Sequence, residues 1–100
     1  MDVKVQSVHF KADQKLIDFY EKRINKLDLF FEGVIGSDVI LKLEKDEDQE
    51  NKVAEIKLSV PANEYLFAKK QAKTFEEAVD LAVDALRKQL DKYKMKVKSK

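Results

Sequence analysis

Polar and apolar residues alternate in two stretches near the middle of the chain. One passes through Val39, Leu41 and Leu43, and the other through alternate positions from Ala54 to Val60, with polar or charged residues between them. A period of two predicts β-strands that bury one face. The polar residues 46–51 between the two stretches predict a hairpin loop.

Two further strands are expected, one on each side of this pair. The first runs from Val3 to Phe10, and a slip in its alternation near Ser7 is compatible with a β-bulge. Residues 61–64 contain proline and asparagine and predict a turn. Residues 65–72 then predict the fourth strand.

Apolar residues recur at helical spacing in two longer stretches. Asp13 predicts an N-cap for a helix that runs to about Leu29. Thr74 and Glu77 predict a capping box for a helix that runs to about Lys96. The apolar stripe of the first helix consists of Leu16, Ile17, Tyr20, Ile24, Leu27 and Phe31. The stripe of the second consists of Phe75, Ala78, Val79, Ala82, Leu86, Leu90 and Tyr93.

The predicted order of elements is therefore β-α-β-β-β-α, in a single domain that spans residues 1–100. Three consecutive strands after a crossover helix favour an α+β fold with a four-stranded, largely antiparallel sheet. Since each helix has one apolar stripe, both helices should pack on one face of this sheet. Their polar faces should then lie side by side on the outside.

Charge is segregated along the chain. The totals nearly cancel, with 20 Lys and Arg against 19 Asp and Glu and a net charge of +1. Residues 44–52 hold five acids, however, whereas residues 86–100 hold seven bases and one acid. This arrangement predicts a positive potential at one end of the molecule. The alternative is that the bases only keep the helix soluble, but the helix dipole favours bases in the last turn and not over three turns.

The first helix adds bases on its polar face. Lys15, Lys22 and Lys26 lie together there, with Arg23 at the edge and Phe19 among them. An aromatic side chain that fills a seam between elements is the favoured interpretation of Phe19, and stacking on a nucleobase is the alternative. From the topology we expect Lys22, Arg23 and Lys26 near the basic half of the last helix. Two adjacent basic helices predict salt-sensitive binding to the phosphates of a structured RNA.

The chain lacks the residues of common catalytic and metal sites. It has no cysteine and one histidine, His9, so it contains no catalytic triad and no soft metal site. Residues 44–50 lack the frame of a calcium loop, and no Lys-Ser or Lys-Thr follows Gly33 and Gly36 as in a phosphate loop. We therefore expect a protein that is not an enzyme and has no cofactor, metal or small-molecule substrate.

Three features predict a cytoplasmic location and no membrane partner. No run of about eighteen apolar residues is long enough to span a bilayer. The first residues lack the basic-then-apolar layout of a signal peptide. The absence of cysteine fits a reducing compartment.

Three stretches resemble the short ribosome hibernation promoting factors and the related ribosome-associated translation inhibitors. They are Lys26-Leu27-Asp28-Leu29-Phe30-Phe31, then Val39-Ile40-Leu41-Lys42-Leu43-Glu44-Lys45, and then Ala78-Val79-Asp80 followed by Leu86-Arg87-Lys88-Gln89-Leu90-Asp91-Lys92-Tyr93-Lys94-Met95-Lys96-Val97-Lys98. The resemblance covers almost the whole chain, and the predicted elements occur in the family's order. The chain departs from the family at Thr74, Phe75 and Glu76, where an Asp, a bulky apolar residue and a Tyr are usual. It also has Ala85 at a position that commonly carries a base, for which Arg87 is a substitute.

The resemblance implies a function on the ribosome. Such proteins bind rRNA of the small ribosomal subunit in the channel used by mRNA and tRNA, and they inhibit translation in stationary phase or under stress. Short members favour ribosome dimerisation and the related inhibitors keep single inactive ribosomes, two roles that the sequence does not separate. The rRNA-facing bases of the family fall on Arg23, Lys26, Lys88, Lys92, Lys94 and Lys96. With Lys22 and Arg87 from the charge pattern, these residues form what we call the basic set.

Two other functions remain open at the level of sequence. A general double-stranded RNA-binding module has a similar layout of two helices on a sheet. A regulatory protein-interaction domain would use the acidic hairpin as its contact. Binding that survives high salt would favour the protein-interaction domain, because contacts to phosphate weaken steeply as salt rises.

Overall fold

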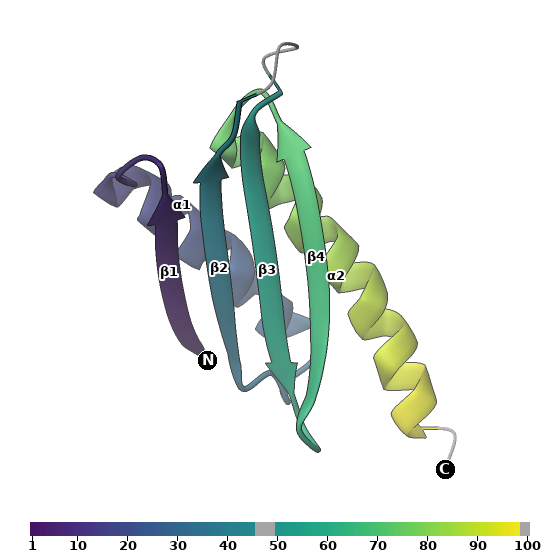
Figure 1. Ribbon diagram of the computed structural model, residues 1–100. Coiled ribbons are helices and arrows are strands. Elements are labelled where there is room, and N and C mark those ends of the chain that lie inside the picture. Colours follow the sequence, from purple (N-terminus) through teal and green to yellow (C-terminus); the bar gives the residue numbers. More distant parts are fainter. Residues whose placement is uncertain (46–49, 99–100) are drawn as a thin grey trace.

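The computed structural model describes residues 1–45 and 50–98, and it has the predicted element order (Figure 1). The elements are β1 (Asp2–Val8), α1 (Gln14–Asn25), the short 3-10 helix η1 (Lys26–Leu29), β2 (Gly36–Leu43), β3 (Lys52–Val60), β4 (Glu64–Ala72) and α2 (Phe75–Lys98). The strands lie side by side in the order β1-β2-β3-β4. Only β1 and β2 are parallel, so the prediction of a largely antiparallel sheet is confirmed.

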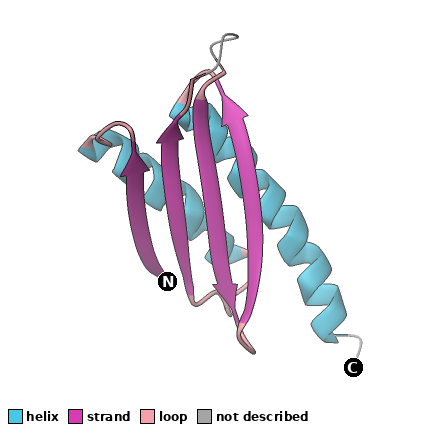
Figure 2. Cartoon of the chain, in the orientation of Figure 1, coloured by secondary structure: helices cyan, strands magenta, loops and turns pink. Residues whose placement is uncertain are grey.

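Both helices cover the same face of the sheet and leave the other face open, as predicted (Figure 2). The core lies between these layers. β3 supplies the alternating residues Ala54, Ile56, Leu58 and Val60, which are all buried. α2 contacts β3, β4 and α1, so the two helices are direct neighbours.

The first helix begins and packs as its sequence predicts. The Asp13 carboxylate accepts a hydrogen bond from the Leu16 amide at 2.9 Å, which caps the helix. The side chains of Tyr20 and Ile24 are fully buried. The Tyr20 hydroxyl donates to the hydroxyl of Ser37 at 3.0 Å, which satisfies two polar groups inside the core. The helix extends to Leu29 as predicted, but its last turn narrows into η1.

The capping box of α2 is half formed. The Thr74 hydroxyl accepts a hydrogen bond from the Glu77 amide at 3.1 Å. The hydrogen bonds of the described residues include no second bond from the Thr74 amide to the Glu77 carboxylate. Behind the cap, the predicted stripe of α2 is buried from Ala78 to Tyr93. The C-terminal turns of α2 project past the sheet in Figure 1.

The end of the first strand differs from the prediction. β1 pairs with β2 without interruption from Asp2 to Val8, so no bulge lies near Ser7. The alternation slips because the strand ends there: His9 has φ 68, a left-handed conformation that turns the chain. Phe10 therefore lies beyond the strand, and its ring stacks on that of Phe75 at a centroid distance of 4.3 Å.

The connections between strands agree with the predicted turns where the structure describes them. Residues 46–49 of the acidic hairpin lie outside the described residues. Glu44 precedes them and Asn51 follows them, and the Glu44 amide donates to the Asn51 carbonyl at 2.9 Å. The second hairpin turns through Ala62 and Asn63, which have φ 67 and φ 57. The connection from η1 to β2 is short, because β2 already begins at Gly36.

Candidate RNA interface on the two helices

Bases from both helices meet at one groove. Arg23 of α1, Lys26 of η1 and Arg87 of α2 line a groove of about 290 Å³ between the helices. The groove exists because the buried stripes turn the polar flanks of α1 and α2 toward one another. The expected juxtaposition of the two helices' bases is therefore present for these three residues.

Arg23 is held by contacts within the protein. Its Nε lies 2.8 Å from the carboxylate of Asp80, and its guanidinium lies 4.7 Å from the centroid of the Phe19 ring. Phe19 is half-buried between the helices, so its interpretation as a seam-filling aromatic is confirmed. Asp80 belongs to the acidic half of α2, so Arg23 pairs with that half while it shares the groove with Arg87 of the basic half. This partner lies 57 residues from Arg23 in the sequence, so local spacing does not predict the contact.

Phe30 links the helices at the other end of the groove. The Arg87 guanidinium lies 5.4 Å from the centroid of its ring, and the Lys94 ammonium donates to its backbone carbonyl. The sequence interpretation omitted Phe30 because it lies off the apolar stripe of the first helix. An aromatic residue outside that stripe and next to bases was the available signal.

The other members of the basic set point elsewhere. Lys88 is exposed on the outer side of α2 and lies 3.4 Å from Asp84 in an i,i+4 ion pair. Lys22 is exposed on α1. Lys92 and Lys96 line the opposite flank of α2, beside β4, where the Lys96 ammonium lies 4.0 Å from the Glu64 carboxylate. The helical rotation of about 100° per residue separates them from Arg87 and Lys94.

The basic set therefore divides into three groups. The helix-groove group consists of Arg23, Lys26, Arg87 and Lys94. The outer pair consists of Lys22 and Lys88. The β4-flank pair consists of Lys92 and Lys96. Among the described residues, no ion pair engages Lys22, Lys26 or Lys92, so these ammonium groups can contact phosphate without breaking one.

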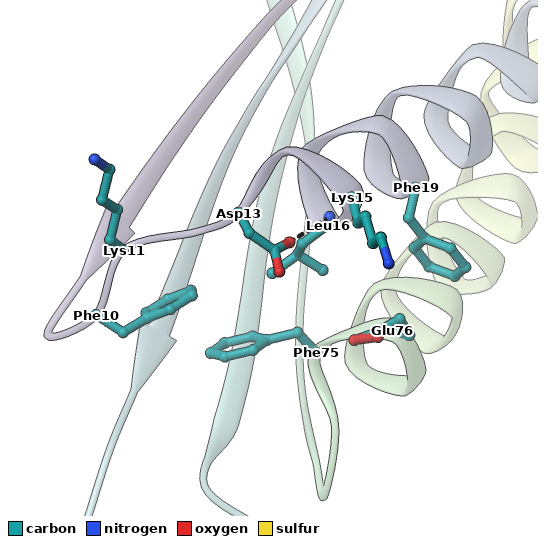
Figure 3. A pocket seen from close by; sticks show the side chains of 8 residues that line it. All are labelled: Phe10, Lys11, Asp13, Lys15, Leu16, Phe19, Phe75 and Glu76. Carbon is teal, nitrogen blue, oxygen red and sulfur yellow. Dashed lines mark hydrogen bonds between the residues drawn. The ribbon is translucent and has the colours of Figure 1, made fainter.

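A larger cavity, of about 490 Å³, lies at the other end of the helices (Figure 3). The stacked rings of Phe10 and Phe75 form one wall, and Lys15 points toward Phe19 across from them. Charges of both signs surround the cavity, including those of Asp13 and Lys15, and no member of the basic set lines it. Two bases and two acids line the cavity, whereas three bases and two acids line the helix groove, so the cavity attracts phosphate less.

The described residues add no sign of chemistry at either site. No group of three or more His, Cys, Asp and Glu side chains within residues 1–45 and 50–98 is arranged to hold a metal ion. His9 is exposed, and its Nδ1 lies 3.3 Å from the carbonyl of Leu43. Among the described helices, none is long and apolar enough to cross a membrane.

Fold and site together define a small α+β domain that presents bases on two parallel helices packed against one face of a mixed sheet. The chain belongs to the family described as Sigma 54 modulation protein / S30EA ribosomal protein, whose model matches residues 3–98. The resemblance predicted from the sequence is thereby confirmed. Relatives of this chain are named ribosome hibernation factors, which are binding proteins and not enzymes, and this agrees with the expected class.

Relatives known by sequence carry hibernation-factor names. The chain is 28% identical over 101 residues to a ribosome hibernation promotion factor of Bacillus subtilis, an alignment that covers 100% of this chain and 52% of the relative. The chain thus spans about half the length of that relative. It is 27% identical over 99 residues to a ribosome hibernation promoting factor of Pseudomonas putida, covering 99% of this chain and 92% of that one.

Solved structures share the fold. A ribosomal subunit interface protein from Coxiella burnetii superposes with a TM-score of 0.82 at 18% identity and covers 95% of this chain and 99% of its own. The N-terminal domain of Protein Y from Thermus thermophilus gives a TM-score of 0.78 at 22% identity and covers 93% and 99%. At these identities the similarity establishes the architecture.

Proposed function

We propose that this protein is a ribosome hibernation factor, which binds rRNA of the small ribosomal subunit in the mRNA and tRNA channel and inhibits translation in stationary phase or stress. The observation that carries the proposal is the meeting of Lys26 and Arg87 from two helices at one groove, in a chain whose relatives are named hibernation factors. The function implies a cytoplasmic location, since ribosomes translate there.

The contacts we propose are electrostatic. Lysine contacts phosphate as a mobile point charge, and arginine can contact two phosphate oxygens at once. The ion pair with Asp80 and the Phe19 ring hold Arg23 in position at the groove, so less side-chain freedom is lost when it binds. Inhibition then requires only that the domain occupy the space used by mRNA and tRNA.

Sedimentation with purified small and large subunits tests this function. Retention on the small subunit should fall steeply between about 50 and 500 mM salt, because each neutralised phosphate releases counterions that salt restores. Binding that is unchanged over this range would contradict a phosphate interface and favour a protein-interaction domain. Equally tight binding to naked duplex RNA would favour a general double-stranded RNA module.

The gradient profile of whole ribosomes tests the finer role. Ribosome dimers and single inactive particles sediment at different rates, so the profile with and without the protein separates the two outcomes implied by the family resemblance. Accumulation of dimers would establish a role in dimerisation. Accumulation of single particles would assign the protein to the inhibitor type.

A further inference from the structure

The open face of the sheet exposes two aromatic rings on β4. Tyr65 and Phe67 are two residues apart, so both point away from the helices, whereas Ala68 points into the core. The side chains are 55% and 54% exposed. Figure 1 looks onto this face, which no helix covers. Core packing therefore does not account for these rings.

Lysines surround the rings. Lys57 of β3 pairs in register with Phe67, and its ammonium lies 4.0 Å from the centroid of the Tyr65 ring. Lys69 follows on the same face, opposite Glu55. The carboxylate of Glu55 is neutralised by Lys42 at 2.7 Å, a contact that raises the pKa of Lys42. Two acids also lie nearby, Asp38 in register with Lys57 and Glu64 beside Lys96. The four lysines at positions 57, 69, 92 and 96 outnumber them, so the charge around the rings is positive on balance.

The rings connect with the β4-flank pair of α2. A groove of about 450 Å³ between β4 and α2 is lined by Tyr65, Lys92 and Lys96, among others. Tyr65 therefore lies where the open face and the flank of the helix meet. A peptide strand is disfavoured at this edge, because the Gln89 side chain donates to the Phe67 carbonyl at 2.9 Å and occupies an acceptor that strand pairing would use.

We propose that this region, the β4 strip, binds single-stranded RNA. It consists of Lys57, Tyr65, Phe67, Lys69, Lys92 and Lys96. Rings two residues apart in a strand are separated by about 7 Å, which leaves room for two successive bases to stack. The lysines contact the backbone phosphates. An exposed contact between an ammonium and a ring is weak, so an incoming base displaces Lys57 from Tyr65 toward a phosphate.

The β4 strip shares Lys92 and Lys96 with the basic set but contains no member of the helix-groove group. Tyr65 and Phe67, which carry this proposal, lie outside the proposed ribosome site, so the proposal is tested at the rings. Unpaired bases are required for stacking, whereas the helices are proposed to recognise structured RNA. Replacing Arg23 and Lys26 by Glu should weaken ribosome binding and leave the stacking contacts in place. Failure of the proposed ribosome binding can thus be distinguished from failure of the proposed binding of single-stranded RNA.

The test uses the full chain and an oligouridylate of about twelve nucleotides that carries 4-thiouridine. Ultraviolet crosslinking followed by mass spectrometry should locate the crosslink at Tyr65 or Phe67. In fluorescence anisotropy, Tyr65→Ala with Phe67→Ala should weaken binding about tenfold or more, since each stacked base contributes substantially. Tyr65→Phe with Phe67→Tyr should retain the parent's affinity because both rings remain.

Phe30→Ala is the matched control, because it removes an aromatic ring from the helix groove. It should leave oligonucleotide binding unchanged, and circular dichroism should show that every variant is folded. Crosslinks confined to α1, η1 or the helix groove would overturn the proposal. So would an affinity for blunt duplex RNA equal to that for the single strand. A dimer of the chain that Tyr65→Ala with Phe67→Ala dissociates, without any loss of RNA binding, would show that the face binds a second copy.

Discussion

Tyr20 shows how one buried polar residue is accommodated in this core. Its ring is fully buried, and its hydroxyl reaches the hydroxyl of Ser37, which is also buried. The helical spacing of Tyr20 predicts that it is buried. The partner of its hydroxyl lies 17 residues away on β2, so the sequence does not indicate how this buried group is satisfied.

Tyr20→Phe should lower the free energy of unfolding by about 1–2 kcal/mol, because it leaves the Ser37 hydroxyl buried without its donor. Urea denaturation measures the change. Adding Ser37→Ala to this variant should recover part of the loss, since both polar groups are then absent. A single variant as stable as the parent would contradict the importance of this hydrogen bond.

The same residue predicts a dependence of stability on pH. Burial raises the pKa of Tyr20 above its ordinary value of 10.0. The unfolded chain loses the Tyr20 hydroxyl proton near that value, while the folded chain retains it. The contribution of this hydroxyl to the free energy of unfolding is therefore complete below about pH 10 and declines as the pH rises further. Urea midpoints between about pH 8 and 11 should fall more in the parent than in Tyr20→Phe. An equal fall of the urea midpoint with pH in the two proteins would contradict the raised pKa of Tyr20.

At the scale of elements, two features of α2 matter. A cap stabilises its start, and the rotation of the helix determines where its bases lie. Thr74 caps the helix, because its hydroxyl accepts a hydrogen bond from the Glu77 amide. The buried stripe faces the sheet and α1, so the bases are distributed over three directions. Helical periodicity predicts the stripe, but the neighbours of each flank depend on how the helix crosses the sheet.

Thr74→Ala should lower the free energy of unfolding by about 1 kcal/mol, because the Glu77 amide loses its acceptor. Thermal unfolding followed by circular dichroism measures it. Thr74→Asp should be as stable as the parent, since Asp is an equally good cap and its charge suits the helix dipole. Equal stability of the Ala and Asp variants would show that the cap contributes little.

Lys88→Glu with Lys92→Glu should abolish ribosome binding and leave the fold intact. Both side chains are exposed, and the lost ion pair between Lys88 and Asp84 contributes only about 0.3–0.5 kcal/mol. Sedimentation with ribosomes measures binding, and circular dichroism measures folding. A folded variant that binds normally would move the interface off this side of α2.

At the scale of the whole molecule, two helices on one sheet face bring bases from distant segments to one groove. The domain measures 47 × 25 × 20 Å, with α2 along its length. Bases of η1 and α2 that are about sixty residues apart line the same groove. We therefore expect that neither helix alone supports full inhibition.

Arg23→Glu with Lys26→Glu should reduce inhibition of translation in vitro even though Lys88 and Lys92 remain. The Arg23–Asp80 pair is exposed, so its loss should cost less than about 1 kcal/mol of stability. Lys4→Glu with Lys11→Glu is the matched control: both are exposed outside the helix groove, and the charge change is equal. Equal loss of inhibition in the control would indicate a general effect of charge.

Inhibition by occupancy should also be reversible. Excess mRNA and initiator tRNA should displace the protein, and the rRNA should be recovered intact. A translation assay with added mRNA and tRNA, followed by electrophoresis of the rRNA, measures both. Cleaved rRNA, or inhibition that excess mRNA and tRNA do not relieve, would contradict this mechanism.

The local pattern of the sequence determined the elements of this protein, their order and the residues they bury. The apolar residues of β3 recur at every second position, and those of α2 recur at helical spacing. Each pattern extends over several residues and follows from the backbone geometry of a strand or a helix, so it is a strong signal. The caps at Asp13 and Thr74 are equally local. The concentration of bases in α2 was likewise visible without a structure.

Tertiary structure alone decided which of these bases act together. Helical rotation assigns Arg87 and Lys92 to different flanks, and packing decides that one flank meets α1 and the other meets β4. The partnership of Arg23 with Asp80 and the exposure of Tyr65 follow from the same packing. Contacts between segments far apart in the chain depend on how whole elements cross one another, and no local pattern of residues encodes that geometry.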